Sequence, residues 1–162
     1  MSDLPIPHEP SGLDSNPADS LADVDGWGMD PSHRAGEPSM SKPKQVQWFD
    51  EPEEHNYPAA QSYLRLLYPD PDAIRLVEQL RAADMASFKA KDIFRASGLS
   101  LLGVSNSHVS KNDDKIQNEV SLSPLLLVRS RIRDSVIVAD GYHRLCAVYR
   151  HNEDAWIPCK IT

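Results

Sequence analysis

The residue types most suited to chemistry lie in one short run, Asp140-Gly141-Tyr142-His143-Arg144, at the end of an apolar β-rich segment. The pattern predicts a strand that stops, a glycine that turns the chain, and a helix whose first turn carries His143 and Arg144. The first N–H groups of a helix have no acceptor within the helix and, with the helix dipole, attract anions. Gly141 has no Cβ and allows close approach. The planar guanidinium of Arg144 can donate two hydrogen bonds to phosphate oxygens, and the imidazole of His143 can add a donor that titrates near neutral pH. Together they would bind a nucleotide polyphosphate.

A purely structural interpretation accounts for the same residues. Asp140 would cap the helix, Gly141 would supply the turn, and Arg144 would be a solvated side chain. A core stripe at positions i, i+3, i+4 and i+7 supports this view and would turn His143, Arg144 and Ala147 toward another face; it consists of Tyr142, Leu145, Cys146 and Tyr149.

Catalysis at this junction would need more than an anion site. Asp140 and His143 could form an acid–base pair beside bound phosphates. Phosphoryl transfer would require a second carboxylate, for Mg²⁺ or as a base. His108 is a further candidate, although a capping or surface role explains it equally well. The carboxylates available in this part of the chain are Asp92, Asp113, Asp114 and Glu119.

The elements that must position these residues follow from hydrophobic spacing and capping residues. We expect helices over residues 58–68 and 71–83, the second with Asp70 as N-cap and Pro71 at its first position, and assign neither any chemistry. Residues 88–97 suggest the end of a strand followed by a turn of helix. Asn106 and Ser107 would cap a helix over residues 108–118, with Val109, Ile116 and Val120 facing inward.

The C-terminal part changes to a strand pattern. Residues 125–128 and 135–139 are apolar runs separated by a charged turn, and they predict a hairpin. A helix over residues 142–150 and a last strand over residues 156–161 follow. The order α-α-β-α-β-β-α-β predicts an α+β domain with a mixed sheet.

Charge and proline divide the 162-residue chain unevenly. Residues 1–60 carry 12 acidic and 3 basic side chains, a net charge of −9, and 9 of the 13 prolines. Such a composition buries little apolar surface, so we expect residues 1–56 to form a disordered acidic, Pro-rich tail that could contact a protein partner. Two apolar spots interrupt it, at residues 24–27 and 46–49; the second could dock on a partner or on its own domain, or could pack locally.

Several protein classes are not expected. No run of about 18 apolar residues would span a membrane, and the first residues lack the basic and apolar regions of a secretion signal. Two cysteines make no disulfide framework, and no zinc motif or phosphate loop is present. We therefore expect a soluble, cytoplasmic protein.

The run from Asp140 to Ile161 resembles the second half of a ParB/sulfiredoxin-like domain. In ParB proteins the corresponding turn reads G-E-R-R, and in sulfiredoxins it reads G-G-C-H-R, each followed by an alanine. This chain has Gly141, His143-Arg144 and Ala147, then Ile157-Pro158 in the last strand. The likeness covers about residues 86–162 and is strongest from residue 122. It suggests a domain over residues 57–162, with a helical extension (57–85) before the core module (86–162).

The resemblance implies a nucleotide site, because ParB proteins hold CTP and sulfiredoxins hold ATP at this turn. Gly141, His143 and Arg144 match the phosphate-binding positions, and Lys111 and Lys115 match a contributing helix in position only. We therefore expect ATP or CTP, with Mg²⁺. Tyr142 stands where sulfiredoxins have their nucleophilic cysteine, so sulfinic acid repair is not expected. Cys146 and Cys159 would be inert, buried thiols.

Three functions are consistent with these features. The first is a ParB-like nucleotide-binding module with a regulatory or interaction role. The second is an ATP- or CTP-dependent phosphotransferase or nucleotide hydrolase of the same superfamily. The third is a DNA-associated ParB-like protein, for which the basic cluster at residues 129–133 is the best contact surface, although a solvated hairpin turn also explains that cluster.

Overall fold

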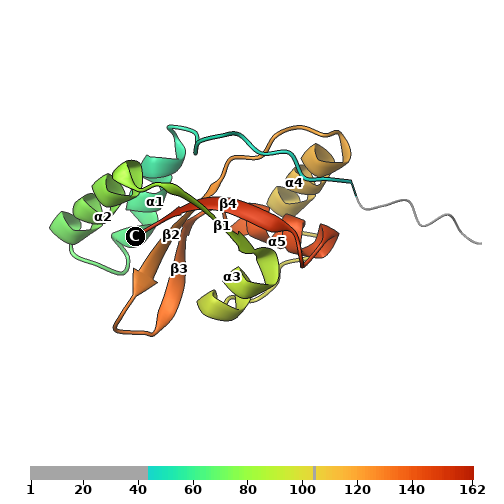
Figure 1. Ribbon diagram of the computed structural model, residues 1–162. Helices are drawn as coiled ribbons and strands as arrows, with labels where there is room; N and C mark the ends of the chain where they lie inside the picture. Colours follow the sequence, from blue (N-terminus) through green and yellow to red (C-terminus); the bar gives the residue numbers. More distant parts are fainter. Residues whose placement is uncertain (1–43, 104) are drawn as a thin grey trace, which may run out of the picture. The chain divides into compact units, whose positions relative to one another are not determined.

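The computed structural model describes residues 44–103 and 105–162, which form a four-stranded sheet flanked by helices (Figure 1). This confirms the α+β class with a mixed sheet. In chain order the elements are α1 (Asn56–Leu64), α2 (Asp70–Ala82), β1 (Met85–Lys89), α3 (Ala90–Ser97), α4 (Ser107–Gln117), β2 (Leu125–Ser130), β3 (Ser135–Asp140), α5 (Tyr142–His151) and β4 (Trp156–Ile161).

The strands lie in the order β1-β4-β2-β3. β1 pairs antiparallel with β4, and β2 and β3 form the predicted hairpin. β4 follows α5 in the chain and pairs with β2 in parallel. This parallel pair makes the sheet mixed. The β2–β3 register shifts between Leu126, which faces Asp140, and Leu127, which faces Val138. Ala139 is therefore an extra residue in β3, and such bulges often redirect a strand end beside a functional site.

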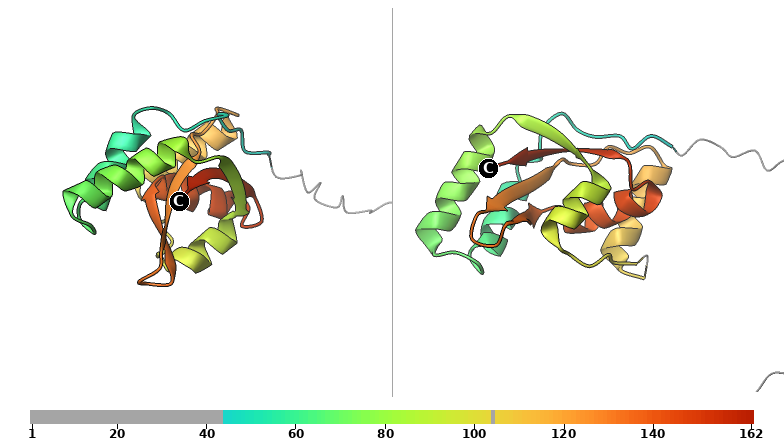
Figure 2. Two further views of the ribbon diagram at one scale, coloured as in Figure 1. Left: turned by 60° about the vertical axis from the view of Figure 1, so that its left-hand side comes forward. Right: turned by 60° about the horizontal axis from the view of Figure 1, so that its bottom comes forward.

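Helices cover both faces of the sheet (Figure 2). Leu125 and Leu127 point into a core shared with α3, α4 and α5, while Leu126 and Val128 point into a second core with α1 and α2. Because side chains alternate across a strand and both faces are covered, every residue from Leu125 to Val128 is buried. This explains the continuous apolar run in the sequence.

Most of the expected elements are confirmed, and the differences are local. The chain has one helix more than the expected order, because the turn after β1 extends into the full helix α3. Asn106 caps α4 as expected, accepting from the N–H groups of His108 and Val109. Pro69, not Asp70, is the N-cap of α2, since Asp70 itself is helical. Val120 is 47% exposed, so its inward orientation was wrong, because it lies beyond the end of α4.

The segment before α1 is part of the folded domain. Trp48 forms a parallel bridge with Leu122, supported by 2.9 Å hydrogen bonds from Leu122 N to Gln47 O and from Phe49 N to Leu122 O. Glu51 forms a 2.8 Å ion pair with the buried Lys160 of β4. The expected tail boundary at residue 56 was therefore wrong for residues 44–56, where aromatic and backbone contacts compensate for the acidic composition. The remainder of that predicted tail, with its apolar spot at 24–27, lies outside the described residues.

Candidate functional site

The junction of β3 and α5 requires glycine. Gly141 has φ +102° and is the N-cap of α5. A Cβ at this position would lie 2.8 Å from Leu125 Cγ and 3.0 Å from Arg144 Nη2. Backbone conformation and close packing therefore both exclude a side chain here. The bulge at Ala139 lies two residues before this glycine.

The first turn of α5 has no side-chain cap. Leu145 N donates to Gly141 O at 2.9 Å and is the first N–H of this helix bonded in the α pattern. Because Gly141 has no side chain, its position cannot supply the oxygen that Ser, Thr, Asp or Asn would give the preceding N–H groups. The start of α5 thus keeps the partial positive charge that favours an anion.

Arg144 is engaged by Asp140. Its Nη2 lies 2.5 Å from Asp140 Oδ2, and the two side chains are only 16% and 20% exposed. This arrangement differs from both sequence-based expectations, since Arg144 is neither a free phosphate fork nor a solvated side chain. Nε of Arg144 is buried and has no hydrogen-bond acceptor among the described residues. One donor of a charged group therefore remains unsatisfied, at a cost of about 1–3 kcal/mol.

Two histidines lie together beside this ion pair. The ring centroids of His143 and of His108, from α4, are 5.0 Å apart, with 37° between the ring planes. Burial lowers the pKa of His143, the positive charges of His108 and Arg144 lower it further, and Asp140 acts in the opposite direction. His143 is therefore a neutral imidazole at neutral pH, able to accept or donate a proton.

These residues line a pocket of about 540 Å³, within the usual size range of small-molecule sites. Its polar side chains come from α4, α5 and the end of β3, and its apolar surface comes from α1, the loop after α3 and β3. The lining residues are Ala59, Tyr63, Leu99, His108, Asn112, Val138, Ala139, Asp140, Gly141, Tyr142, His143 and Arg144.

The structure brings only part of the predicted set together. Asp140, Gly141, His143 and Arg144 share the pocket, as does His108. Lys111 and Lys115 are exposed on α4 and do not line it, because the helix directs His108 and Asn112 there instead. Asn112 follows His108 by one helical turn, so extending the pattern from His108 would have found it.

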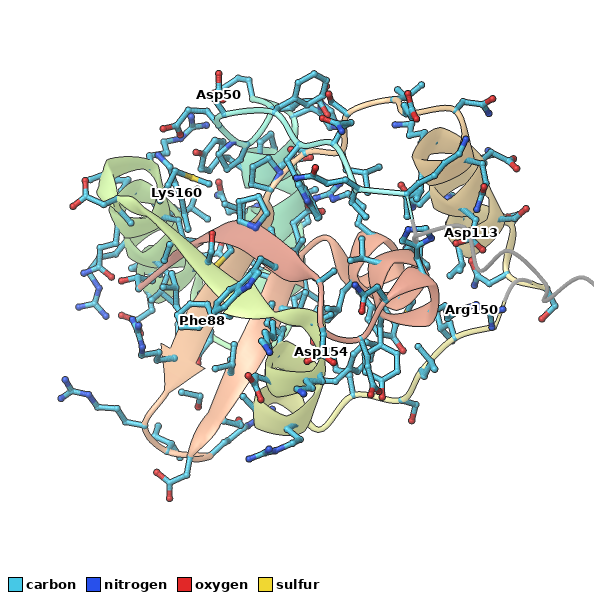
Figure 3. The ribbon with its side chains drawn as sticks, turned by 45° about the vertical axis from the view of Figure 1, so that its right-hand side comes forward. Asp50, Phe88, Asp113, Arg150, Asp154 and Lys160 are labelled. Carbon is cyan, nitrogen blue, oxygen red and sulfur yellow. The ribbon has the colours of Figure 1, made fainter. Side chains whose placement is uncertain are left out.

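The candidate second carboxylates lie elsewhere. Asp113 lies near Arg150 (Figure 3), which is in the last turn of α5, and burial raises the pKa of Asp113. Asp92 lies 3.8 Å from Arg95 on α3. Asp114 and Glu119 are exposed and do not line the pocket. The structure therefore places Asp140 as the carboxylate of this pocket.

The two residues that α1 contributes to the pocket were not predicted from the sequence. No chemistry was expected of the helix over residues 58–68, but Tyr63 is 39% exposed and lines the pocket, as does Ala59 one turn earlier. Helical spacing shows only that one face is apolar, and α1 packs on the sheet through Tyr57, Ala60 and Leu64. Nothing in the local sequence indicated that its other face would border this site.

The thiols are placed as expected for inert side chains. Cys146 and Cys159 are both fully buried. Burial raises the pKa of Cys146 and raises that of Cys159 to about 11. Tyr142, at the sulfiredoxin cysteine position, donates its hydroxyl to Ser100 O, which ties the loop after α3 to α5. Ala147, expected on a face other than the core stripe, is buried in the core that α4 shares with α5.

Other candidate sites are weaker. Within residues 44–103 and 105–162, no three His, Cys, Asp or Glu side chains gather closely enough to hold a metal ion. The helices in the same residues are all too short or too polar to cross a membrane. Arg129, Arg131 and Arg133 are exposed around the β2–β3 turn, so DNA contact through this cluster stays a prediction.

Comparison with models of known families finds no match, and searches of curated sequences and of solved structures find no similar protein. The ParB/sulfiredoxin resemblance therefore stays a prediction that depends on the motif and on the element order around it.

Proposed function

We propose that this chain is a cytoplasmic nucleotide-binding module that holds a nucleotide polyphosphate, ATP or CTP, at the junction from Asp140 to Arg144, with a regulatory or interaction role. The observation that carries this proposal is the buried, unsatisfied Nε of Arg144 together with the uncapped start of α5, at a residue that lines a pocket of about 540 Å³. A phosphate oxygen would supply the acceptors that these donors lack.

The charge of the pocket argues for a magnesium-bound form of the ligand. The carboxylate of Asp140 offsets the charge of Arg144, so a bare triphosphate would meet little net positive charge. Mg²⁺ is commonly held by one or two carboxylates together with substrate phosphates. Asp140 would serve as that carboxylate and would couple the cation to the phosphates.

A second candidate function is nucleotide hydrolysis or phosphoryl transfer. It is favoured by His143 and His108, whose imidazoles lie together on the wall of the same pocket. A neutral imidazole at neutral pH can accept a proton from water or from an acceptor hydroxyl. Phosphate released by the wild type and not by His143→Ala would support this function over the binding module.

The proposal is tested by titrating ATP, CTP and GTP with Mg²⁺ into the full chain by calorimetry. We expect Arg144→Ala to weaken nucleotide binding at least tenfold, because charge-assisted hydrogen bonds to phosphate are lost. Arg150→Ala is the matched control, since Arg150 is exposed at the other end of α5. Affinity of Arg144→Ala within twofold of wild type would refute the site.

A further inference from the structure

The pocket has an apolar part that phosphate binding does not use. Its surface there comes from Ala59 and Tyr63 of α1, Leu99 of the loop after α3, and Val138 of β3. Polyphosphate and Mg²⁺ are charged and make no favourable contact with apolar side chains. A ligand that fills the whole pocket must therefore carry an apolar or aromatic group besides its charged one.

The pocket is lined by residues that belong to both faces of the sheet. Val138 belongs to the core shared with α4 and α5, whereas Ala139 belongs to the core shared with α1. β3 is the last strand of the sheet on this side, so the pocket passes around its edge. The charged groups of α4 and α5 are thus at one end, and the α1 surface is at the other.

Tyr63 is not part of either hydrophobic core. Tyr57, Ala60 and Leu64 anchor α1 in the second core, which leaves Tyr63 on the pocket side, 39% exposed. Leu99, 36% exposed, lines the same part of the pocket. A smaller hollow of about 100 Å³ along β3 shares Tyr63, Leu99 and Val138 with the pocket, and its lining also includes the polar residues Ser97, Arg133 and Ser135. Tyr63 thus borders the main pocket of about 540 Å³ and also this hollow.

We infer that Tyr63 is the stacking surface for the base of the bound nucleotide, so that α1 determines whether the site takes a nucleotide or only a polyphosphate. This inference rests on the proposed function and adds the class of ligand, a nucleoside triphosphate whose base is recognised through its π-face. Stacking on an aromatic side chain tolerates different bases. The site would therefore discriminate weakly between ATP and CTP and strongly between either of them and inorganic tripolyphosphate.

The test compares ATP, CTP and inorganic tripolyphosphate, each with Mg²⁺, on the full chain. We expect Tyr63→Ala to weaken ATP and CTP binding about tenfold and to leave tripolyphosphate binding within twofold of wild type. Tyr63→Phe should bind like the wild type, because the ring remains. Leu66→Ala, a 79% exposed residue outside the pocket, is the control for loss of an apolar surface side chain on the same segment.

The failures of the two ideas are distinguishable. If Tyr63→Ala binds nucleotides as tightly as the wild type while Arg144→Ala loses them, the stacking role is wrong and the phosphate site stands. If Tyr63→Ala loses tripolyphosphate equally, Tyr63 shapes the phosphate site and the inference is also wrong. If the wild type binds neither nucleotides nor tripolyphosphate, the proposed function fails and the inference fails with it.

Discussion

Arg144 Nη2 lies 2.5 Å from Asp140 Oδ2, and the pair closes over Gly141 at the point where β3 becomes α5. The pair fixes the guanidinium at the edge of the pocket and at the same time offsets its charge. Both side chains are mostly buried, so solvent screens the pair less than it would at the surface. The charge state of this pair therefore affects the affinity of the pocket for an anion.

Replacing Asp140 with Asn should change the metal dependence of nucleotide binding. The substitution removes one negative charge, which even with the full screening of bulk water is worth on the order of 1 kcal/mol at 4 Å, or about a fivefold change in affinity. Binding without Mg²⁺ should become tighter by about that factor, and the gain from adding Mg²⁺ should shrink. Calorimetry with ATP in EDTA and in Mg²⁺ measures both. Asp154→Asn, at another ion-paired but distant aspartate, is the control, and an unchanged Mg²⁺ dependence in Asp140→Asn would contradict the assigned role.

Gly141→Ala should be strongly destabilising. Its φ of +102° is unfavourable for an L-residue, by about 1–2 kcal/mol, and the new Cβ would lie 2.8 Å from Leu125 Cγ, adding about 1–3 kcal/mol of overpacking. Gly98→Ala is the matched control, with φ +64° and open space around its Cβ position, and should cost only the first amount. Urea unfolding gives both free energies; equal losses would show that close packing at Gly141 is unimportant.

The free energy of unfolding should decrease as pH is lowered, because His143 becomes protonated more readily in the unfolded chain. Burial and the charges of His108 and Arg144 lower its folded pKa below the unfolded value of about 6.5, so protonation favours the unfolded chain. The contribution of His143 is present above about pH 6.5 and is lost as pH falls below it. His143→Gln should therefore lose less thermal stability than the wild type between pH 7.5 and 5.5. His55→Gln, at an exposed histidine outside the pocket, should behave like the wild type.

The reverse trend is expected for ligand binding. A bound polyphosphate would stabilise the protonated imidazole of His143, so nucleotide affinity should rise as pH falls over the same range. Calorimetry in buffers of different ionisation enthalpy would detect the accompanying proton uptake. Equal affinities for the wild type and for His143→Gln at pH 5.5 would show that this histidine does not contact the phosphates.

Both cysteines should be unreactive in the folded chain. Each is fully buried, and burial raises both thiol pKa values, that of Cys159 to about 11, so little thiolate exists at pH 8. Labelling with a thiol-specific reagent should reach completion only in denaturant, with two labels per chain. Rapid native labelling of Cys146 would contradict this and would reopen thiol chemistry one turn from the pocket.

The local signals of the sequence were sufficient for most of the fold. The apolar run from Leu125 to Val128, the Asn106 cap and the glycine before His143 each act within a few residues, because strand alternation, capping and backbone conformation are short-range effects. The same locality located Asp140, Gly141, His143 and Arg144 as one cluster. Composition was a poorer guide at residues 44–56, where contacts with Leu122 and Lys160 offset an acidic, Pro-rich segment.

The sequence by itself determined the elements and the junction between β3 and α5, since each follows from the conformational preferences of neighbouring residues. Only the tertiary structure decided which side chains surround that junction. Tyr63 reaches the pocket because α1 packs on β3 far along the chain, and His108 and Asn112 reach it because α4 packs on α5. The engagement of Arg144 by Asp140 was settled in the same way, because burial favours a paired charge over a free one.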